Sequence, residues 1–377
     1  MIDRKVLAIP FNYDKRWIGG VYYVRNLISA LNLLPNDRKP KIIILSQSDD
    51  GYNYLDEETQ YPYMDWTIPG LVRGYDIGLS RKRRYINRFL HWYKNNDFVF
   101  YVVFPHPIPS VSDSTICWIP DFQDKRLPEL FHNEELEQRT IQHIEYASRA
   151  KHIVFSSKSA LVDFEYFYPG YNVQKHVVRF AAFNDVSNLL SFEYIQNKYS
   201  LPANYFYCPN QFWIHKNHKV VIEAVAKLAN KHSKICLAFS GKEYDHRAPS
   251  YTDDLKNLVR KLGLSENVRF LGFIPRNDQL AILKNARLVV QPSLFEGWST
   301  VIEDAKSLSQ YVLASDINTH REQLVANGEL FSPNDFDALS VLLEKYLEVD
   351  PPIKEFDYST NQMKFAKDFI SVVMGDL

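Results

Sequence analysis

Cysteine is scarce in this chain. Three residues of this type, Cys117, Cys208 and Cys236, occur among 377, and none belongs to a C-x-x-C pair. An odd number of cysteines without clustered histidines encodes neither a disulfide framework nor a structural zinc site. The cysteine usage therefore fits a reducing compartment, and the cytoplasm fits best.

Long hydrophobic runs and an excess of one charge are also missing. No stretch approaches the roughly 18 apolar residues of a membrane-spanning helix, and residues 1–7 carry charges where a signal peptide would be apolar. Lys and Arg number 44 against 45 Asp and Glu, a formal net charge of −1 that provides no global basic field for binding nucleic acid. We expect a cytoplasmic protein without a nucleic-acid partner, peripheral at most on the inner face of a membrane.

Glycine is infrequent too, with 13 residues, while 46% of the chain is hydrophobic and 24% is charged. These values exclude collagen-like, low-complexity and wholly disordered chains and are typical of a globular protein. The length predicts two to three domains, and two is our working number.

In the first half of the chain, short β-branched runs alternate with helical apolar stripes. Continuous apolar strands separated by helices favour a parallel sheet covered on both faces. Residues 49–78 fit neither pattern. Strands are predicted over 6–9, 42–45, 98–104, 115–119, 153–155 and 177–180, and helices over 21–34, 134–150 and 158–167.

A polar stretch over 184–204 interrupts this alternation, which then resumes. The predicted fold class is α/β, with two Rossmann-like doubly wound parallel-sheet domains facing across a cleft, where open sheets of this kind bind ligands. We expect an N-terminal domain over 1–184, a second domain over 185–350 and a helical segment over 351–377 that could pack back on the first. The second series comprises strands at 205–208, 235–240, 268–271, 288–291 and 312–314, helices at 217–231, 251–262, 277–285 and 300–308, and a final helix at 359–374.

The segment 292–306 carries the most information, because it follows a predicted strand and opens a helix with a Glu-Gly-Trp turn at Glu296. A helical wheel directs Glu303 away from the apolar side of that helix and places Asp304 at its edge. Thr300 and Glu303 have the spacing of a capping box, in which the Glu303 carboxylate would accept from the Thr300 N–H. Helix capping is therefore the favoured role of Glu303.

A second segment, 209–219, also lies between a strand and a helix. Asn217 is a suitable N-cap, and Lys216 just before it could neutralise an anionic ligand at a helix N-terminus. A surface lysine is the alternative reading.

Candidate residues of the first half lie where predicted strands end. Asp121 follows the strand at 115–119, and a carboxylate there could accept a proton or cap a loop. His106 ends the preceding strand and is either a cleft residue or structural. Gly19 and Gly20, in the loop after the first strand, would let a ligand approach the backbone closely.

A basic patch, Arg81–Arg88, precedes an aromatic run at 89–93. It could contact an anionic membrane near a lipid-linked acceptor. A solvated basic face is the more common reading of such a patch.

Taken together, the segments 292–306, 209–219, 117–129 and 315–322 resemble retaining glycosyltransferases of the group-one, family-four type, which have the GT-B fold. The resemblance implies a metal-independent hexosyltransferase that moves a sugar from a nucleotide-sugar to a glycan or lipid-linked acceptor with retention of configuration. The donor, UDP- or GDP-linked, would be a substrate rather than a cofactor. Bacterial surface polysaccharide synthesis is the implied context.

The resemblance also implies roles for individual residues. Glu296 would face the transferred sugar, Lys216 the leaving diphosphate, and Asp121 the acceptor hydroxyl, while Asp304 would bind the donor ribose. The chain departs from the family at Asp304, where glutamate is usual, and likewise at Gln211 for arginine and Pro120 for histidine. Either His215 or a residue of the N-terminal domain could compensate for the missing arginine. The implied donor-binding residues are Gly19, Gly20, Gln211, Lys216, Gly241, Phe273, Ile274, Gly297, Trp298, Ser299, Thr300, Glu303 and Asp304.

Two other functions remain open. One is a nucleotide-sugar epimerase on the same fold, and the other is a non-catalytic protein that binds a nucleotide-sugar or a glycan, favoured by the three departures. A nicotinamide oxidoreductase is disfavoured because neither first strand–helix loop has G-x-G-x-x-G. Asp49-Asp50 and Asp253-Asp254 do not form a D-x-D metal site.

Overall fold

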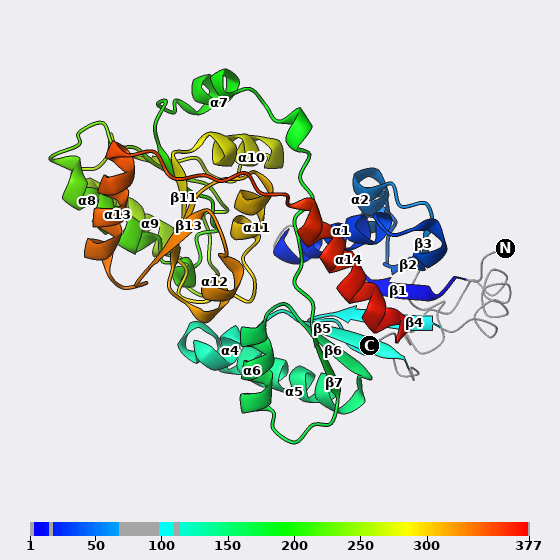
Figure 1. The fold of residues 1–377 in the computed structure, drawn as a ribbon. Coiled ribbons are helices and arrows are strands. Elements are labelled where there is room, and N and C mark those ends of the chain that lie inside the picture. The colour runs from blue at the N-terminus through cyan, green and yellow to red at the C-terminus, as the bar shows by residue number, and fades with distance from the viewer. Residues whose placement is uncertain (1–3, 15–17, 68–97, 109–113, 376–377) are drawn as a thin grey trace. The chain divides into compact units, whose positions relative to one another are not determined.

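The computed structural model describes residues 4–14, 18–67, 98–108 and 114–375. The chain divides into two compact units, one of Met1–Phe183 with Ser359–Leu377 and one of Asn184–Tyr358 (Figure 1). Residues 351–358, which we had grouped with the terminal helix, thus belong to the second unit. The basic patch Arg81–Arg88 lies outside the described residues.

The first unit contains a sheet of seven described strands in the order β3-β2-β1-β4-β5-β6-β7. β1 pairs in parallel with both β2 and β4, so the strand order reverses between β1 and β4. The bounds are β1 (Val6–Pro10), β2 (Lys41–Leu45), β3 (Met64–Thr67), β4 (Phe98–Val103), β5 (Thr115–Ile119), β6 (His152–Phe155) and β7 (Gln174–Val177).

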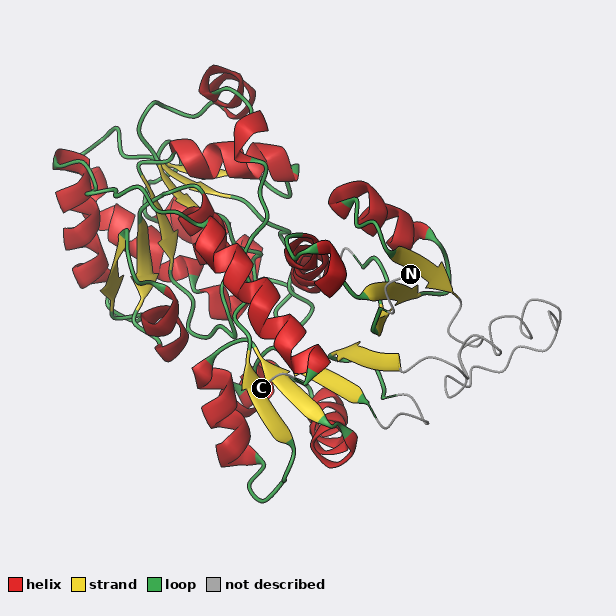
Figure 2. Cartoon of the chain, turned by 45° about the vertical axis from the view of Figure 1, so that its right-hand side comes forward, coloured by secondary structure: helices red, strands yellow, loops and turns green. Residues whose placement is uncertain are grey.

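Helices cover both faces of this sheet (Figure 2). Alternate residues of β4 point to opposite faces: Phe100 packs in a core with Tyr146 and Phe164, whereas the Tyr101 ring lies edge-on to Phe369, 4.8 Å between centroids. The helices are α1 (Ile18–Asn32), α2 (Asp50–Thr59), α4 (Gln123–Arg126), α5 (Asn133–Arg149), α6 (Lys158–Phe167) and α14 (Ser359–Met374), with short 3₁₀ turns η2 (Asn36–Arg38) and η4 (Pro128–Leu130).

The terminal helix α14 packs beside α1 in the first unit, although the whole second unit separates them in sequence. Its apolar stripe, which includes Phe365, Phe369 and Ile370, is fully buried. On the same face, Tyr23 of α1 stacks on Trp118 of β5, with ring centroids 3.7 Å apart. The first unit is therefore closed by the last helix of the chain.

The second unit contains a sheet of six described strands in the order β10-β9-β8-β11-β12-β13. β8 pairs in parallel with both β9 and β11, so here the order reverses between β8 and β11. The bounds are β8 (Phe206–Cys208), β9 (Leu237–Phe239), β10 (Val268–Phe270), β11 (Leu288–Gln291), β12 (Val312–Ser315) and β13 (Gly328–Phe331).

Two buried cores lie on the two faces of this sheet. One joins it to α8, α9 and α13, and the other joins it to α7, α10 and α11. The helices are α7 (Phe192–Tyr199), α8 (His218–Ala229), α9 (Tyr251–Lys261), α10 (Arg276–Asn285), α11 (Thr300–Ser307), α12 (Asn318–Gln323) and α13 (Phe336–Glu348), with 3₁₀ turns η5 (Val186–Asn188) and η6 (Ile214–Lys216).

The predicted class, two parallel α/β domains, is confirmed, but several local predictions are wrong. The strand expected at 177–180 lies at 174–177, and Val178 and Phe180 are buried in the irregular backbone that follows it. The polar stretch 184–204 contains α7, and the unassigned stretch 49–78 contains α2 and β3.

Among the described residues, no helix is long and apolar enough to cross a membrane.

Candidate functional site

The loops that follow β8 and β11 meet at the reversal of strand order, where open parallel sheets bind ligands. The Asn210 side-chain amide donates to Gln291 Oε1 at 2.9 Å and ties the two loops together. Gly241, after β9, presses against the first loop with φ +153°, and a Cβ there would lie 2.1 Å from the Asn210 carbonyl oxygen. Only glycine fits this position.

Two predicted residues, Lys216 and Glu296, come together at this point. Lys216 Nζ donates to Glu296 Oε1 at 2.6 Å, and the side chains are 14% and 10% exposed. The same oxygen accepts from Gln291 Nε2 at 2.8 Å and Ser293 Oγ at 2.7 Å. The main chain is held as well, because Thr319 Oγ1 donates to the Glu296 carbonyl oxygen at 2.7 Å.

This environment keeps Glu296 ionised. Burial alone would raise its pKa, but the Lys216 ammonium and the hydrogen bonds from Lys216 and Ser293 lower it below its usual value. Burial lowers the pKa of His320, and also of His215 and His218 beside Lys216. The imidazoles around the ion pair are therefore neutral at pH 7.

The second carboxylate oxygen of Glu296 has a different environment. Three donors converge on Oε1, whereas Oε2 has no hydrogen-bond partner among the described residues and is not sealed from solvent. The Lys216 ammonium also has unused hydrogen-bond donors, because it offers three N–H groups and only one of them donates to a described residue. The site thus offers one acceptor oxygen and one partly committed cation to a ligand.

The expected capping box is wrong. Ser299 rather than Thr300 is the N-cap of α11, and its Oγ accepts from the Ile302 N–H at 3.4 Å. Glu303 does not point to solvent, being 1% exposed. The helical wheel gave the wrong environment for Glu303 because Gln323 of α12 and Tyr358, just before α14, pack against this side of α11.

Both oxygens of Glu303 are occupied. Oε1 accepts from Lys306 Nζ at 2.8 Å and Gln323 Nε2 at 2.9 Å, and Oε2 accepts from the Tyr358 hydroxyl. The Gln323 side chain also makes two hydrogen bonds with the main chain of Ser299: its Oε1 accepts from the N–H, and its Nε2 donates to the carbonyl oxygen. Glu303 is therefore committed to holding the start of α11.

Asp304 is also buried, but only one of its oxygens is used. Oδ1 accepts from Arg276 Nη2 at 2.5 Å and Asn184 Nδ2 at 3.0 Å. Oδ2 has no hydrogen-bond partner among the residues that the structure describes, and it is not among the sealed polar atoms. Asp304, unlike Glu303, keeps an acceptor available.

The loop around Lys216 departs from expectation in one detail. Asn217 occupies the N-cap position of α8, but its side chain makes no cap hydrogen bond and instead donates to the carbonyl oxygens of Pro292 and Pro333. This links the loop after β8 to the loop after β11. His215 and Gln211 follow β8 on the same loop, His215 buried and Gln211 half-buried.

The remaining predicted residues of the second unit lie at the same edge of its sheet. Phe273 is 62% exposed and Ile274 packs partly into the core, just after Gly272, whose carbonyl accepts from the Gly241 N–H at 2.9 Å. Gly297 and Trp298 are buried before α11.

Four predicted residues belong to the first unit. Gly19 and Gly20 lie in the first turn of α1 rather than in the preceding loop, and a Cβ on Gly19 would meet no atom within 4 Å. Asp121 Oδ1 accepts from the Gln123 N–H at 3.0 Å, a loop-capping contact. The His106 carbonyl accepts from Gln142 Nε2 at 3.1 Å, and burial lowers the pKa of its imidazole.

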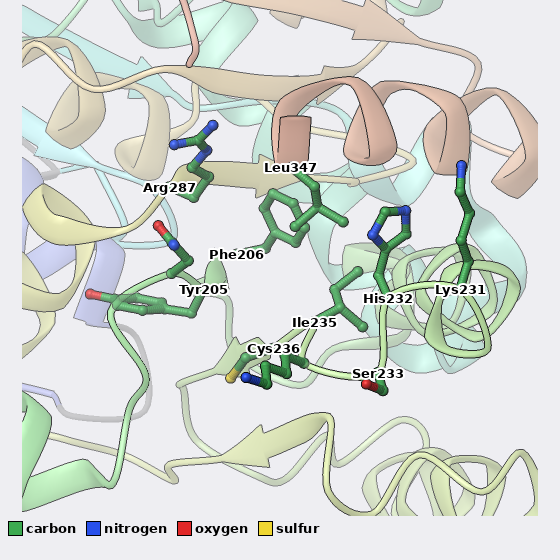
Figure 3. Close-up of a pocket in the computed structure, with 11 residues that line it drawn as sticks. Tyr205, Phe206, Lys231, His232, Ser233, Ile235, Cys236, Arg287 and Leu347 are labelled. Atoms are coloured by element: carbon green, nitrogen blue, oxygen red, sulfur yellow. The ribbon is translucent and has the colours of Figure 1, made fainter. Parts of the chain in front are cut away.

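A pocket of about 370 Å³ opens at the opposite edge, before β8, β9 and β11 begin (Figure 3). His232, on its wall, forms a group with Glu344 and Glu348 whose geometry could hold a metal ion. Lys231 Nζ lies 2.5 Å from Glu344 Oε1, so a lysine already neutralises that carboxylate. Neither feature is part of the site around Glu296.

Sequence reasoning missed the supporting side chains of this site. Gln291 ends the apolar strand β11, and a buried amide at a strand end was an available signal. Arg276 and Asn184 carried no signal, because their contacts with Asp304 span 28 and 120 positions of the chain.

Residues 193–363 match the family model described as "Glycosyl transferases group 1". The O-antigen chain mannosyltransferase B of Escherichia coli is 32% identical over 101 residues, 26% of this chain and 26% of that protein, so the alignment spans about a quarter of this curated relative. The solved glycosyltransferase from Rickettsia africae superposes with a TM-score of 0.65 at 18% identity, covering 99% of this chain and 94% of that one. The structure of Anabaena HepE in complex with UDP and glucose superposes with a TM-score of 0.64 at 13% identity, covering 99% of this chain and 95% of that one.

These structural matches extend over both units and establish the GT-B fold. The family match falls within the second unit, apart from its last few residues, and includes Lys216, Glu296 and Asp304. The chain therefore has the GT-B fold, and most of its second unit is similar to the group 1 glycosyl transferases.

Proposed function

We propose that this protein is a retaining glycosyltransferase that moves a sugar from a nucleotide-sugar to a glycan or lipid-linked acceptor without a metal ion. The observation that carries the proposal is the largely buried Lys216–Glu296 pair at the reversal of strand order, with Glu296 Oε2 left open. Two similar proteins support it, since one is a mannosyltransferase and the other was solved with UDP and glucose.

In this proposal the leaving diphosphate binds between Lys216 and the start of α11. The two uncommitted N–H groups of the Lys216 ammonium and the positive end of the helix stabilise the charge that develops as the glycosidic bond breaks. Gln211, in place of the usual arginine, adds no charge, so Lys216 provides most of this charge stabilisation. These groups make a metal ion unnecessary for the step.

Glu296 Oε2 then faces the anomeric carbon, where positive charge develops. An ionised carboxylate stabilises that charge, and the lowered pKa of Glu296 keeps it ionised. The acceptor hydroxyl attacks from the side of the departing phosphate, which retains the configuration. Its proton passes to a phosphate oxygen or to Asp121 of the first unit.

Asp304 Oδ2 accepts from the ribose hydroxyls, and the main chain at Phe273 and Ile274 contacts the base. Main-chain contacts leave the choice of base to pocket shape, so UDP- and GDP-sugars are the first donors to test.

Thermal unfolding against UDP-, GDP-, ADP- and TDP-sugars is the first experiment, because a ligand that binds the folded state raises the midpoint. The stabilising donor is then incubated with glycan and lipid-linked acceptors, and NMR of the product gives its anomeric configuration. We expect one donor class to bind, a retained linkage and full activity in EDTA.

Other outcomes would redirect the assignment. A free epimer formed without acceptor would indicate the epimerase, and donor binding without transfer or hydrolysis would indicate a non-catalytic binding protein. An inverted product would exclude the retaining step, and loss of activity in EDTA would exclude metal independence.

A further inference from the structure

Asp304 is held by two side chains that converge on a single oxygen. Arg276 Nη2 and Asn184 Nδ2 donate to Oδ1 at 2.5 and 3.0 Å, while Oδ2 has no partner among the described residues. The carboxylate is 5% exposed and the Arg276 side chain 21%. An aspartate on a helix can rotate about its side-chain bonds, and two donors on one oxygen select one orientation and turn the other oxygen outward.

The two donors are themselves fixed. Arg276 Nη1 donates to Gln279 Oε1 at 2.8 Å, and its Nη2 also donates to Asn184 Oδ1 at 3.2 Å. Asn184 Nδ2 in turn donates to Ser307 Oγ at 2.9 Å, one turn further along α11. Together with Asp304, these side chains form a connected network of five rather than a lone ion pair.

The network also joins two parts of the proposed donor site. Arg276 is the first residue of α10 and follows Pro275, directly after the loop that contains Phe273 and Ile274. Asp304 lies on α11, which starts just after Glu296. The guanidinium thus connects the loop expected to contact the base with the helix expected to contact the ribose.

We propose that Arg276 and Asn184 are positioning residues that orient Asp304 so that Oδ2 accepts from ribose hydroxyls, giving selectivity for ribonucleotides. This inference rests on the proposed function, in which a nucleotide binds at this edge of the second unit. Asparagine and arginine here act through Asp304 and need not touch the ligand. They also explain how the shorter aspartate serves where glutamate is usual, because it is held rather than free.

The test compares UDP with 2′,3′-dideoxy-UDP, and GDP with its dideoxy form, by isothermal titration calorimetry on the full chain. For the wild type we expect the ribonucleotide to bind at least about tenfold more tightly, the usual scale of hydrogen bonds to a charged group. Asp304→Asn and Arg276→Met should each reduce this ratio below about threefold. Arg276→Lys should restore part of it, and Asn184→Ala should give an intermediate ratio.

Arg260→Met, at the end of α9, is the matched control and should keep the wild-type ratio. A merely structural role of Arg276 would lower the unfolding midpoint and both affinities together while leaving the ratio unchanged, and that result would overturn the inference. If Arg276→Met does not fold, the ratio in Asn184→Ala decides, and an unchanged ratio there overturns it equally. Wild-type protein that binds both forms equally refutes ribose recognition by Asp304, whereas binding of neither refutes the proposed function itself.

Discussion

At the scale of single residues, three neighbouring carboxylates differ in how their oxygens are used. Glu303 has both oxygens engaged inside the second unit, whereas Glu296 and Asp304 each keep one oxygen without a described partner. Fully engaged carboxylates stabilise a fold, and half-engaged ones remain able to bind. This difference in how the oxygens are used predicts different effects for substitutions at Glu303 and at Asp304, although the two residues are neighbours in the chain.

We expect Glu303→Gln to lower stability and Asp304→Asn to lower nucleotide affinity. Losing the Glu303 charge leaves Lys306 buried without its ion-pair partner, at a cost of about 3 kcal/mol. Asp304→Asn should weaken UDP or GDP binding about tenfold. Unfolding midpoints and titration calorimetry on both variants check this, and the reverse order of effects would assign the ribose to Glu303.

Lys216→Met should weaken diphosphate binding at least about tenfold and shift the pH profile of transfer. Because Lys216 lowers the pKa of Glu296, its removal raises that pKa, so activity should be lost at a higher pH on acidification than in the wild type. Lys219→Met, three residues further and 62% exposed, is the control. If the acidic limb of the pH profile does not move in Lys216→Met, Lys216 does not control the ionisation of Glu296.

Asp124 in α4 predicts a pH effect on stability. Burial raises its pKa to about 6, against the opposing charges of Arg139 and Lys125, and neither oxygen has a hydrogen-bond partner within the described part of the chain. A raised folded-state pKa means that stability is lost as pH rises from about 4 to about 6, by at most about 3 kcal/mol. Asp124→Asn should therefore raise the unfolding midpoint at pH 7.5 and leave it nearly unchanged at pH 4.

At the scale of elements, α11 explains why part of the site could be predicted. The turn before this helix is local in sequence, so Glu296 and the start of α11 were predictable from 292–306, and Lys216 from its place between a strand and a helix. The cap was misassigned by one residue because Thr300 and Ser299 are both good caps, and only packing against Gln323 decides. Arg276 and Asn184 could not be predicted, since tertiary contacts bring them to Asp304.

The terminal helix α14 was correctly predicted over 359–374. Its energetic role follows from packing: Phe369→Ala would leave a cavity beside Tyr101 and cost about 3–4 kcal/mol. Because this helix belongs to the first unit, nucleotide affinity should not change. Chemical denaturation and nucleotide titration of the variant check both statements, with exposed Val341→Ala as the control.

At the scale of the whole molecule, the two units have separate sheets and separate cores. We expect two calorimetric unfolding transitions. A bound nucleotide should raise the midpoint temperature of only one of them, because the proposed donor residues other than Gly19 and Gly20 lie in the second unit. Phe369→Ala should lower the midpoint temperature of the other transition. A single transition that moves as a whole with nucleotide would show that the units unfold together.

The return of the chain to the first unit also bears on how the protein is made. A ribosome releases the second unit complete, from Asn184 to Tyr358, before it releases the helix that closes the first. The face of the first sheet at Tyr101, against which Phe369 of α14 packs, therefore stays open until α14 has been synthesised. The unit synthesised first is thus completed only after the second one, and termination of the chain before α14 would expose this surface while leaving the second unit intact.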